Sequence, residues 1–198
     1  MVNIIANSCI GGYIYRDINQ QFNNPFMWSL MKCNDMEQLI LNYTKVNWAN
    51  FKLILTPNQY FIVRVDDCFN IHYTHYILAY GHKMTKLNDA DVLDERIYEY
   101  VCQKYMTRLR RMISDGISPR FVIMAATQGQ YDYTEENLRH LIENTSDSPY
   151  KKCIITNYSC ITDIAGRNDD IVMVDHPINY DPYNTKYYAN TYKTQIIG

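Results

Sequence analysis

The segment from residue 120 to 157 most constrains the fold, because it predicts a strand, a helix and a second strand in succession. The apolar run RFVIMAA is followed by a polar loop, the helical pattern TEENLRHLIENT and a second apolar run, KKCIITN. This is the length that a right-handed crossover between parallel strands requires. A further apolar run, DIVMVD, predicts another strand. We therefore predict an α/β fold with a mostly parallel sheet flanked by helices.

The rest of the chain is compatible with this fold. VNIIA reads as a buried strand and GYIYRDI as a helix, with Cys9 to Gly12 as the turn between them. DMEQLILNYTKV predicts a helix with Asp35 as its N-cap. FKLILT and YFIVRV are short β-prone runs that suggest an antiparallel edge, and FNIHYTHYIL is a third extended segment. Apolar residues at every fourth position predict the longest helix within 91–114, ended by SDG.

Length and charge narrow the class of protein. The chain has 198 residues, of which 47% are hydrophobic, and we predict a single domain over residues 1–198, although the tail 177–198 lacks a firm periodicity. The net charge of −2 argues against a nucleic-acid partner, because such proteins need a basic face. No run approaches the roughly 20 apolar residues of a membrane helix, and the N-terminus does not resemble a signal peptide.

The cysteines predict a reducing compartment. The chain has six of them, scattered and without a CxxC pair, so neither a zinc site nor a disulfide framework is indicated. We therefore predict a cytoplasmic protein with free thiols, no metal and no cofactor.

Cys9 is the main candidate nucleophile. It lies between the first predicted strand and the first predicted helix, where the field of a helix N-terminus lowers the pKa of a thiol. Gly11 and Gly12 would let a substrate or an oxyanion approach the backbone closely. The alternative is that Cys9 is a packed residue and that the glycines only relieve crowding. The same backbone could also cradle a phosphate without using the thiol.

Three histidines are candidate general bases. His72 and His75 point to opposite faces if their segment is a strand, so at most one would share a cleft with Cys9. Asp66 and Asp67 lie just upstream and could orient an imidazole. His176, next to Asp175 at the end of a predicted strand, is a rival base. Each ring could equally be a hydrogen-bonded residue of a half-buried aromatic layer.

Two further groups could bind substrate. Arg108 and Arg111 share one face of the long helix, where paired guanidiniums suit a phosphate or a carboxylate; a solvated helix end is the alternative. The loop after RFVIM offers amide, carboxylate and aromatic groups to a polyhydroxylated ligand, or is an ordinary polar loop; these groups are Gln128, Gln130, Asp132 and Tyr133.

Several of these segments together resemble a known family. ANSCIGGYIYRDINQQFNNPF, IHYTHY, the helix ending YMTRLRRM and FVIMAA resemble the bacterial domain-of-unknown-function family 1919 over most of residues 3–158. Members of this family are often labelled exopolysaccharide biosynthesis proteins. A more distant similarity links the chain to papain-like cysteine peptidases, which also pair an early Cys with a later His. The positions that match the family motif are Asn7, Cys9, Gly11, Gly12, Tyr15, Asn24, Pro25, Phe26, His72, His75, Tyr76, Arg108 and Arg111.

Two departures from the family pattern affect this comparison. Ala6, Asn7 and Ser8 replace the usual order of the polar triplet, and LNDADVLDERIYEY is longer than the stretch expected before the arginine helix. The longer stretch weakens the alignment of the arginines.

Three functions follow from these residues and this resemblance. The first is a glycan-modifying enzyme, a thiol-dependent acyl transferase or esterase that acts on a saccharide or an activated sugar. In it Cys9, His75 and His72 would be catalytic. Its substrate-binding residues would be Asn7, Gly11, Gly12, Arg108, Arg111, Gln128 and Tyr133. The second is a non-catalytic glycan-binding or scaffold protein, and the third is a glycosyltransferase, for which Asp89-Ala90-Asp91 has only the bare form of the metal-binding motif.

Overall fold

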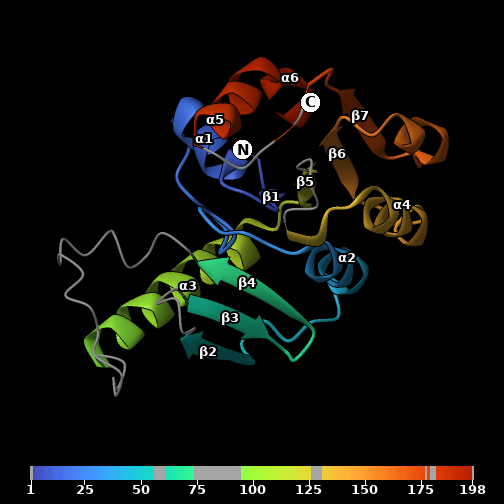
Figure 1. Ribbon diagram of the computed structural model, residues 1–198. Coiled ribbons are helices and arrows are strands. Elements are labelled where there is room, and N and C mark those ends of the chain that lie inside the picture. Colours follow the sequence, from blue (N-terminus) through green and yellow to red (C-terminus); the bar gives the residue numbers. More distant parts are fainter. Residues whose placement is uncertain are drawn as a thin grey trace.

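The computed structural model describes residues 2–55, 61–73, 95–125, 131–176, 178 and 182–197. Among these residues the main sheet has the strand order β1-β5-β6-β7 (Figure 1), and every neighbouring pair is parallel. The α/β class and the mostly parallel sheet predicted from the sequence are therefore confirmed. The strands are Ile4–Ala6, Arg120–Met124, Lys151–Thr156 and Asp169–Met173.

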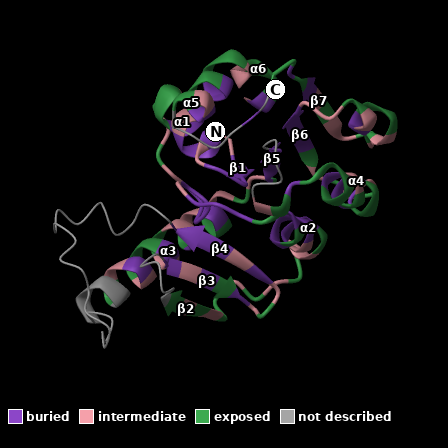
Figure 2. Cartoon of the chain, in the orientation of Figure 1, coloured by how far each residue is buried: buried purple, intermediate pink, exposed green. Residues whose placement is uncertain are grey.

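Helices cover both faces of this sheet, which explains why β1, β5 and β6 contain continuous apolar runs rather than alternating ones. Ile4, Val122 and Cys153 face α1 (Ile10–Asp17), α5 (Pro182–Thr191) and α6 (Lys193–Ile197). Ile5, Phe121 and Ile154 face α2 (Cys33–Asn42) and α4 (Glu135–Asn144). Figure 2 shows that buried residues concentrate in β1, β5 and β6 and on the helix faces turned towards them.

The crossover from β5 through α4 to β6 has the predicted form. The Thr134 side chain accepts a hydrogen bond from the backbone N–H of Asn137 and caps α4, and two glutamates follow in the first turn. A 3₁₀ helix, η3 (Ser159–Ile164), connects β6 to β7.

A second, antiparallel sheet lies beside the first. It consists of β2 (Phe51–Leu55), β3 (Phe61–Val65) and β4 (Phe69–Tyr73), in that order. The antiparallel strands thus form a sheet of their own. One backbone bridge joins Leu30 to His72 of β4, and the next residue, Met31, donates a hydrogen bond to the carbonyl of Asn7. This bridge holds the small sheet near the end of β1.

The long helix α3 (Glu95–Asp115) follows the small sheet in the chain and belongs to the same core cluster. Phe51 of β2 and Tyr105 of α3 have ring centroids 4.5 Å apart. The predicted helix within 91–114 is confirmed over the residues that the structure describes, and Gly116, with φ of +59°, follows its end as expected for a C-terminal glycine.

Three local predictions need correction. The helix α1 begins at Ile10, so both glycines lie inside it rather than in a turn. The N-cap of α2 is Lys32, and Asp35 instead accepts hydrogen bonds from Asn70 at the start of β4. The tail forms α5 and α6, which the sequence did not reveal because α5 combines many tyrosines and asparagines with little periodicity.

Candidate functional site

Cys9 lies at the carboxyl edge of the parallel sheet, as the N-cap residue of α1. It has helical backbone angles and is only partly exposed to solvent. The preceding Ser8 accepts a hydrogen bond from the backbone N–H of Ile10, at 3.4 Å. Strand β1 therefore does deliver a sulfur atom to the N-terminus of a helix, at the edge where open parallel sheets bind ligands.

The predicted lowering of the Cys9 pKa is wrong. Burial raises the pKa of the Cys9 thiol to about 11. The lost solvation of the anion is the cause, and it outweighs the favourable field of the helix N-terminus. At pH 7 only ~1 in 10,000 such thiols carries a charge, so any nucleophilic use of Cys9 requires a base that removes the proton during the reaction.

The two glycines of α1 allow close packing inside the protein. A Cβ atom at Gly12 would lie 2.7 Å from two atoms of the Trp28 indole, and one at Gly11 would lie 3.3 Å from Cβ of Ala6. Tyr13 also contacts Trp28 in an edge-to-face pair, with centroids 5.1 Å apart. Since Trp28 occupies the space beside Gly12, an approach of substrate to the backbone at that position is not supported.

We expect Gly12→Ala to lower the free energy of unfolding by about 1–2 kcal/mol, because the clash with Trp28 outweighs the better helix propensity of alanine. Urea denaturation followed by circular dichroism measures this. Gly11→Ala is the matched control and should change stability by less than about 1 kcal/mol, because its contacts are closer to ordinary distances. Equal effects of the two substitutions would contradict the packing role of Gly12.

Asn7 completes the sheet where β1 ends. Its side chain donates a hydrogen bond to the carbonyl of Met124 and accepts one from the backbone N–H of the same residue, both at 2.9 Å. The side chain therefore continues the pairing with β5 for one more position. Asn7 was predicted to bind substrate, and the structure shows it holding the backbone beside Cys9.

His72 is buried on β4 and is directed towards α2. Its Nε2 atom lies 3.9 Å from Oδ2 of Asp35, which is buried as well. Asp35 is thus the carboxylate that faces this imidazole. Asp66 instead accepts hydrogen bonds from Asn47 and Asn50 near the hairpin turn, which leaves the orienting role proposed for it unsupported. His75, Tyr76 and the Asp89-Ala90-Asp91 motif lie outside the described residues.

The two candidate arginines hold the loop between α1 and α2. Arg108 donates to the carbonyl of Met27 at 3.3 Å and its guanidinium lies 5.6 Å from the centre of the Phe22 ring. Arg111 donates to the carbonyl of Phe22 at 3.1 Å. These contacts tie α3 to the loop that carries Trp28, which is a structural role rather than an open anion site.

The same loop is fixed on its other side to β1. The Tyr15 hydroxyl accepts from the backbone N–H of Ile4 and contacts Asn23, while Asn24 donates to the carbonyl of Ile4 at 2.7 Å. Phe26 is fully buried in the core. Several residues that match the family motif therefore support the junction between β1 and α1.

The loop after β5 is described only from Tyr131 onward, so Gln128 and Gln130 lie outside the described residues. Tyr133 is fully buried, and its carbonyl accepts a hydrogen bond from the Tyr158 hydroxyl. A stacking surface for a sugar at Tyr133 is therefore not supported.

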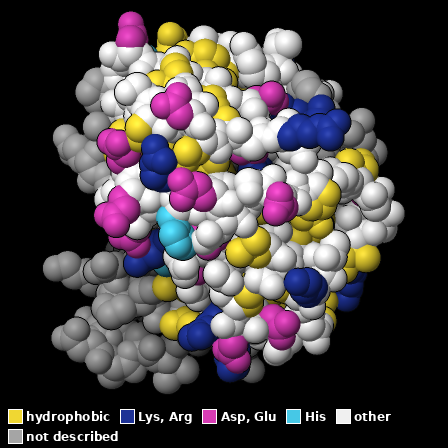
Figure 3. Space-filling view, turned by 90° about the vertical axis from the view of Figure 1, so that its right-hand side faces the viewer, with side chains coloured by type: hydrophobic (Ala, Val, Ile, Leu, Met, Phe, Trp, Pro, Cys, Tyr) yellow, Lys and Arg dark blue, Asp and Glu magenta, His cyan; other side chains and the backbone are white. Residues whose placement is uncertain are grey.

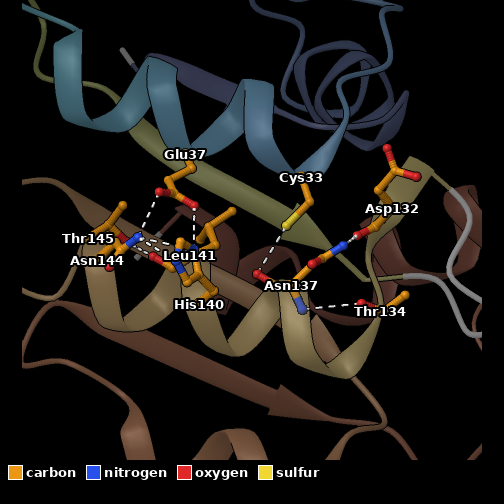
Figure 4. Close-up of polar contacts among 9 residues, drawn as sticks. All are labelled: Cys33, Glu37, Asp132, Thr134, Asn137, His140, Leu141, Asn144 and Thr145. Carbon is orange, nitrogen blue, oxygen red and sulfur yellow. Dashed lines mark hydrogen bonds and ion pairs between the residues drawn. The ribbon is translucent and has the colours of Figure 1, made fainter.

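In the close-up of Figure 4, Asn137 donates to the carbonyl of Asp132, and the Cys33 thiol donates to the carbonyl of Asn137.

Backbone strain gathers near this edge. Among the described non-glycine residues, six have positive φ. Asn19 follows the end of α1, and Asp66 and Asp67 form a type I′ turn, so ordinary turn geometry explains these three. The remaining three lie in the loop that packs on α1 and in the loop after β5; they are Trp28, Tyr131 and Asp132. Strained backbone of this kind clusters at functional sites.

A buried carboxylate between α2 and α4 was not anticipated from the sequence. Glu37 accepts from Nδ2 of Asn144 at 2.9 Å and lies 3.3 Å from Nδ1 of His140 (Figure 4). No local pattern pairs residues about one hundred positions apart. On the face of the molecule shown in Figure 3, acidic and basic side chains are intermixed, and a histidine lies next to acidic side chains.

His176, the rival base, lies at the far edge of the sheet. Its ring contacts Asp175 at 2.9 Å and the Tyr188 hydroxyl at 2.8 Å. Strand β7 is three positions away from β1, which separates the strand ends by about 14 Å at the usual spacing between strands.

The described part of the chain contains no cluster of three or more His, Cys, Asp or Glu side chains suited to a metal, and none of its helices could span a membrane.

Comparison with known proteins supports the resemblance in the N-terminal part of the chain. Residues 1–85 match the model of a family described as a domain of unknown function, DUF1919. The match includes Cys9 and His72 and ends before α3, so the arginines lie beyond it. No curated protein matches the chain.

Proposed function

We propose that this protein modifies a surface glycan, an exopolysaccharide or an activated precursor of one, by thiol-dependent acyl transfer or ester hydrolysis. The observation that carries the proposal is the position of Cys9, partly exposed at the N-terminus of α1 and at the carboxyl edge of the parallel sheet. The exopolysaccharide label that often accompanies the resembling family suggests the substrate class. Six free cysteines are consistent with a reducing, cytoplasmic setting.

The raised pKa of Cys9 determines the form of the reaction. An imidazole, His72 or His75, would take the thiol proton while sulfur attacks the carbonyl carbon of an ester. The imidazolium would then protonate the departing alkoxide, leaving a thioester on Cys9. A sugar hydroxyl or water would attack that thioester and restore the thiol.

The test uses p-nitrophenyl acetate as an acyl donor and intact-protein mass spectrometry with peptide mapping. We expect one acetyl group on Cys9 of the natural protein and none at that position in Cys9→Ala. With an assisting imidazole, the rate of acetylation should not follow the fraction of Cys9 thiolate as the pH rises. Cys160→Ala removes a partly exposed thiol elsewhere and is the matched control, which should still acetylate Cys9.

Two results would contradict the catalytic proposal. The first is a rate of Cys9 acetylation that rises about tenfold per pH unit up to pH 11, as for an unassisted thiol with the raised pKa. The second is a large fall of the melting temperature in Cys9→Ser, which would show that the thiol mainly packs.

A second candidate function is saccharide binding without turnover, favoured by exposed aromatic residues on α5. Tyr183 and Tyr187 lie one helical turn apart and are 89% and 51% exposed. The Tyr187 ring lies 6.4 Å from that of His176, beside the exposed Asp175. Aromatic faces next to polar groups suit sugar rings. Binding of a glycan that survives Cys9→Ala and is lost in Tyr187→Ala would favour this function over catalysis.

A further inference from the structure

A cavity of about 350 Å³ opens at the amino edge of the parallel sheet, the edge opposite to Cys9. The starts of β1 and β5 line it together with the loop 117–119, and α6 closes it on another side. This volume lies in the range of small-molecule sites, about 300–1,000 Å³. The cavity therefore has the size of a binding site and lies away from the candidate catalytic thiol.

Two cations lie side by side in this cavity. Arg120 and Lys151 are direct register partners at the first positions of β5 and β6, so their side chains leave the sheet on the same face. Both line the cavity, whereas no Asp or Glu is among the described residues that line it. Asp170 of β7 pairs with Arg120 on the same face of the sheet, but it is not among the residues that line the cavity. Like charges placed next to each other favour an anion between them.

Arg120 also has a buried donor that lacks an acceptor. The residue is 8% exposed, and its Nη2 atom contacts Asp170 and the carbonyl of Gln195. Its Nε–H is buried and has no hydrogen-bond partner among the described residues. A buried polar group in this state is costly, and native proteins usually satisfy it. Because this nitrogen has almost no accessible surface, an anion in the cavity would reach it only after the Arg120 side chain shifts.

The other walls are largely apolar. They include Val2, Ile4, Pro119, Ile196 and Ile197. We propose that this cavity binds a short amphipathic organic anion, whose phosphate or carboxylate pairs with Arg120 and Lys151 and whose hydrocarbon part packs against α6. The site is independent of the chemistry at Cys9.

The test is isothermal titration of the full chain with hexyl phosphate, compared with hexanol and with inorganic phosphate. We expect saturable binding of hexyl phosphate, and binding at least about tenfold weaker for the two partial ligands, because each lacks one half of the interaction. Methyl resonances of Ile196 and Ile197 should shift during the titration. These shifts place the ligand in the cavity.

Charge reversal at Lys151, an exposed residue, tests the anion site while Arg120 and Asp170 are both retained. Lys151→Glu should weaken hexyl phosphate binding by about tenfold or more, whereas Lys186→Glu, on α5 and outside the cavity, should change it by less than about twofold. Three results would overturn the proposal: no saturable binding of hexyl phosphate, equal binding of hexanol, or an affinity that Lys151→Glu leaves unchanged.

Discussion

Lys152→Met should lower the free energy of unfolding by about 3–5 kcal/mol, the largest effect that we expect from a single substitution. Lys152 is fully buried, with its Nζ atom 3.0 Å from Oδ1 of Asp169 and 2.6 Å from the carbonyl of Thr145 at the end of α4. Methionine keeps the volume of the side chain but removes the cation. The Asp169 carboxylate would then remain buried without its charge partner.

Urea denaturation at neutral pH measures this effect, and the neighbouring residue provides the control. Lys151 is exposed on the opposite face of β6, so Lys151→Met should change stability by less than about 0.5 kcal/mol. The double variant Lys152→Met with Asp169→Leu should recover much of the loss, because a buried pair can often be replaced by apolar residues. A loss below about 1 kcal/mol for Lys152→Met alone would contradict the buried ion pair.

Asn7→Ala should lower the free energy of unfolding by about 2–4 kcal/mol, because it removes two buried hydrogen bonds to the backbone of Met124. An unsatisfied buried group costs about 1–3 kcal/mol, and the effects of adjacent groups are not fully additive. The loss is therefore structural and should appear whether or not a ligand is present.

The control for Asn7 is Asn190→Ala on the exposed side of α5, for which we expect a change within about 0.5 kcal/mol. Thermal and urea unfolding of both variants provide the comparison. If Asn7→Ala kept its full stability but lost the acetylation of Cys9, Asn7 would be a substrate-binding residue, as the sequence suggested, and its structural role would be refuted.

The amino-acid sequence determined the elements whose signals are local. The crossover from β5 to β6 is readable because apolar runs, the Thr134 cap and the amphipathic pattern of α4 all lie within about forty consecutive residues. The position of Cys9 between β1 and α1 is local in the same sense. The residues that match the family model also lie in one stretch, residues 1–85.

Only the tertiary structure decided what the candidate residues do, because their partners are distant in the chain. Trp28 fills the space beside Gly12, and backbone carbonyls of the loop between α1 and α2 accept hydrogen bonds from Arg108 and Arg111. These contacts form only when α3 packs against that loop. The pairing of Lys152 with Asp169 likewise requires β6 and β7 to be aligned. The pKa of Cys9 is the clearest case, since sequence position supplies a helix N-terminus while burial, a property of the whole fold, controls how well the thiolate is solvated.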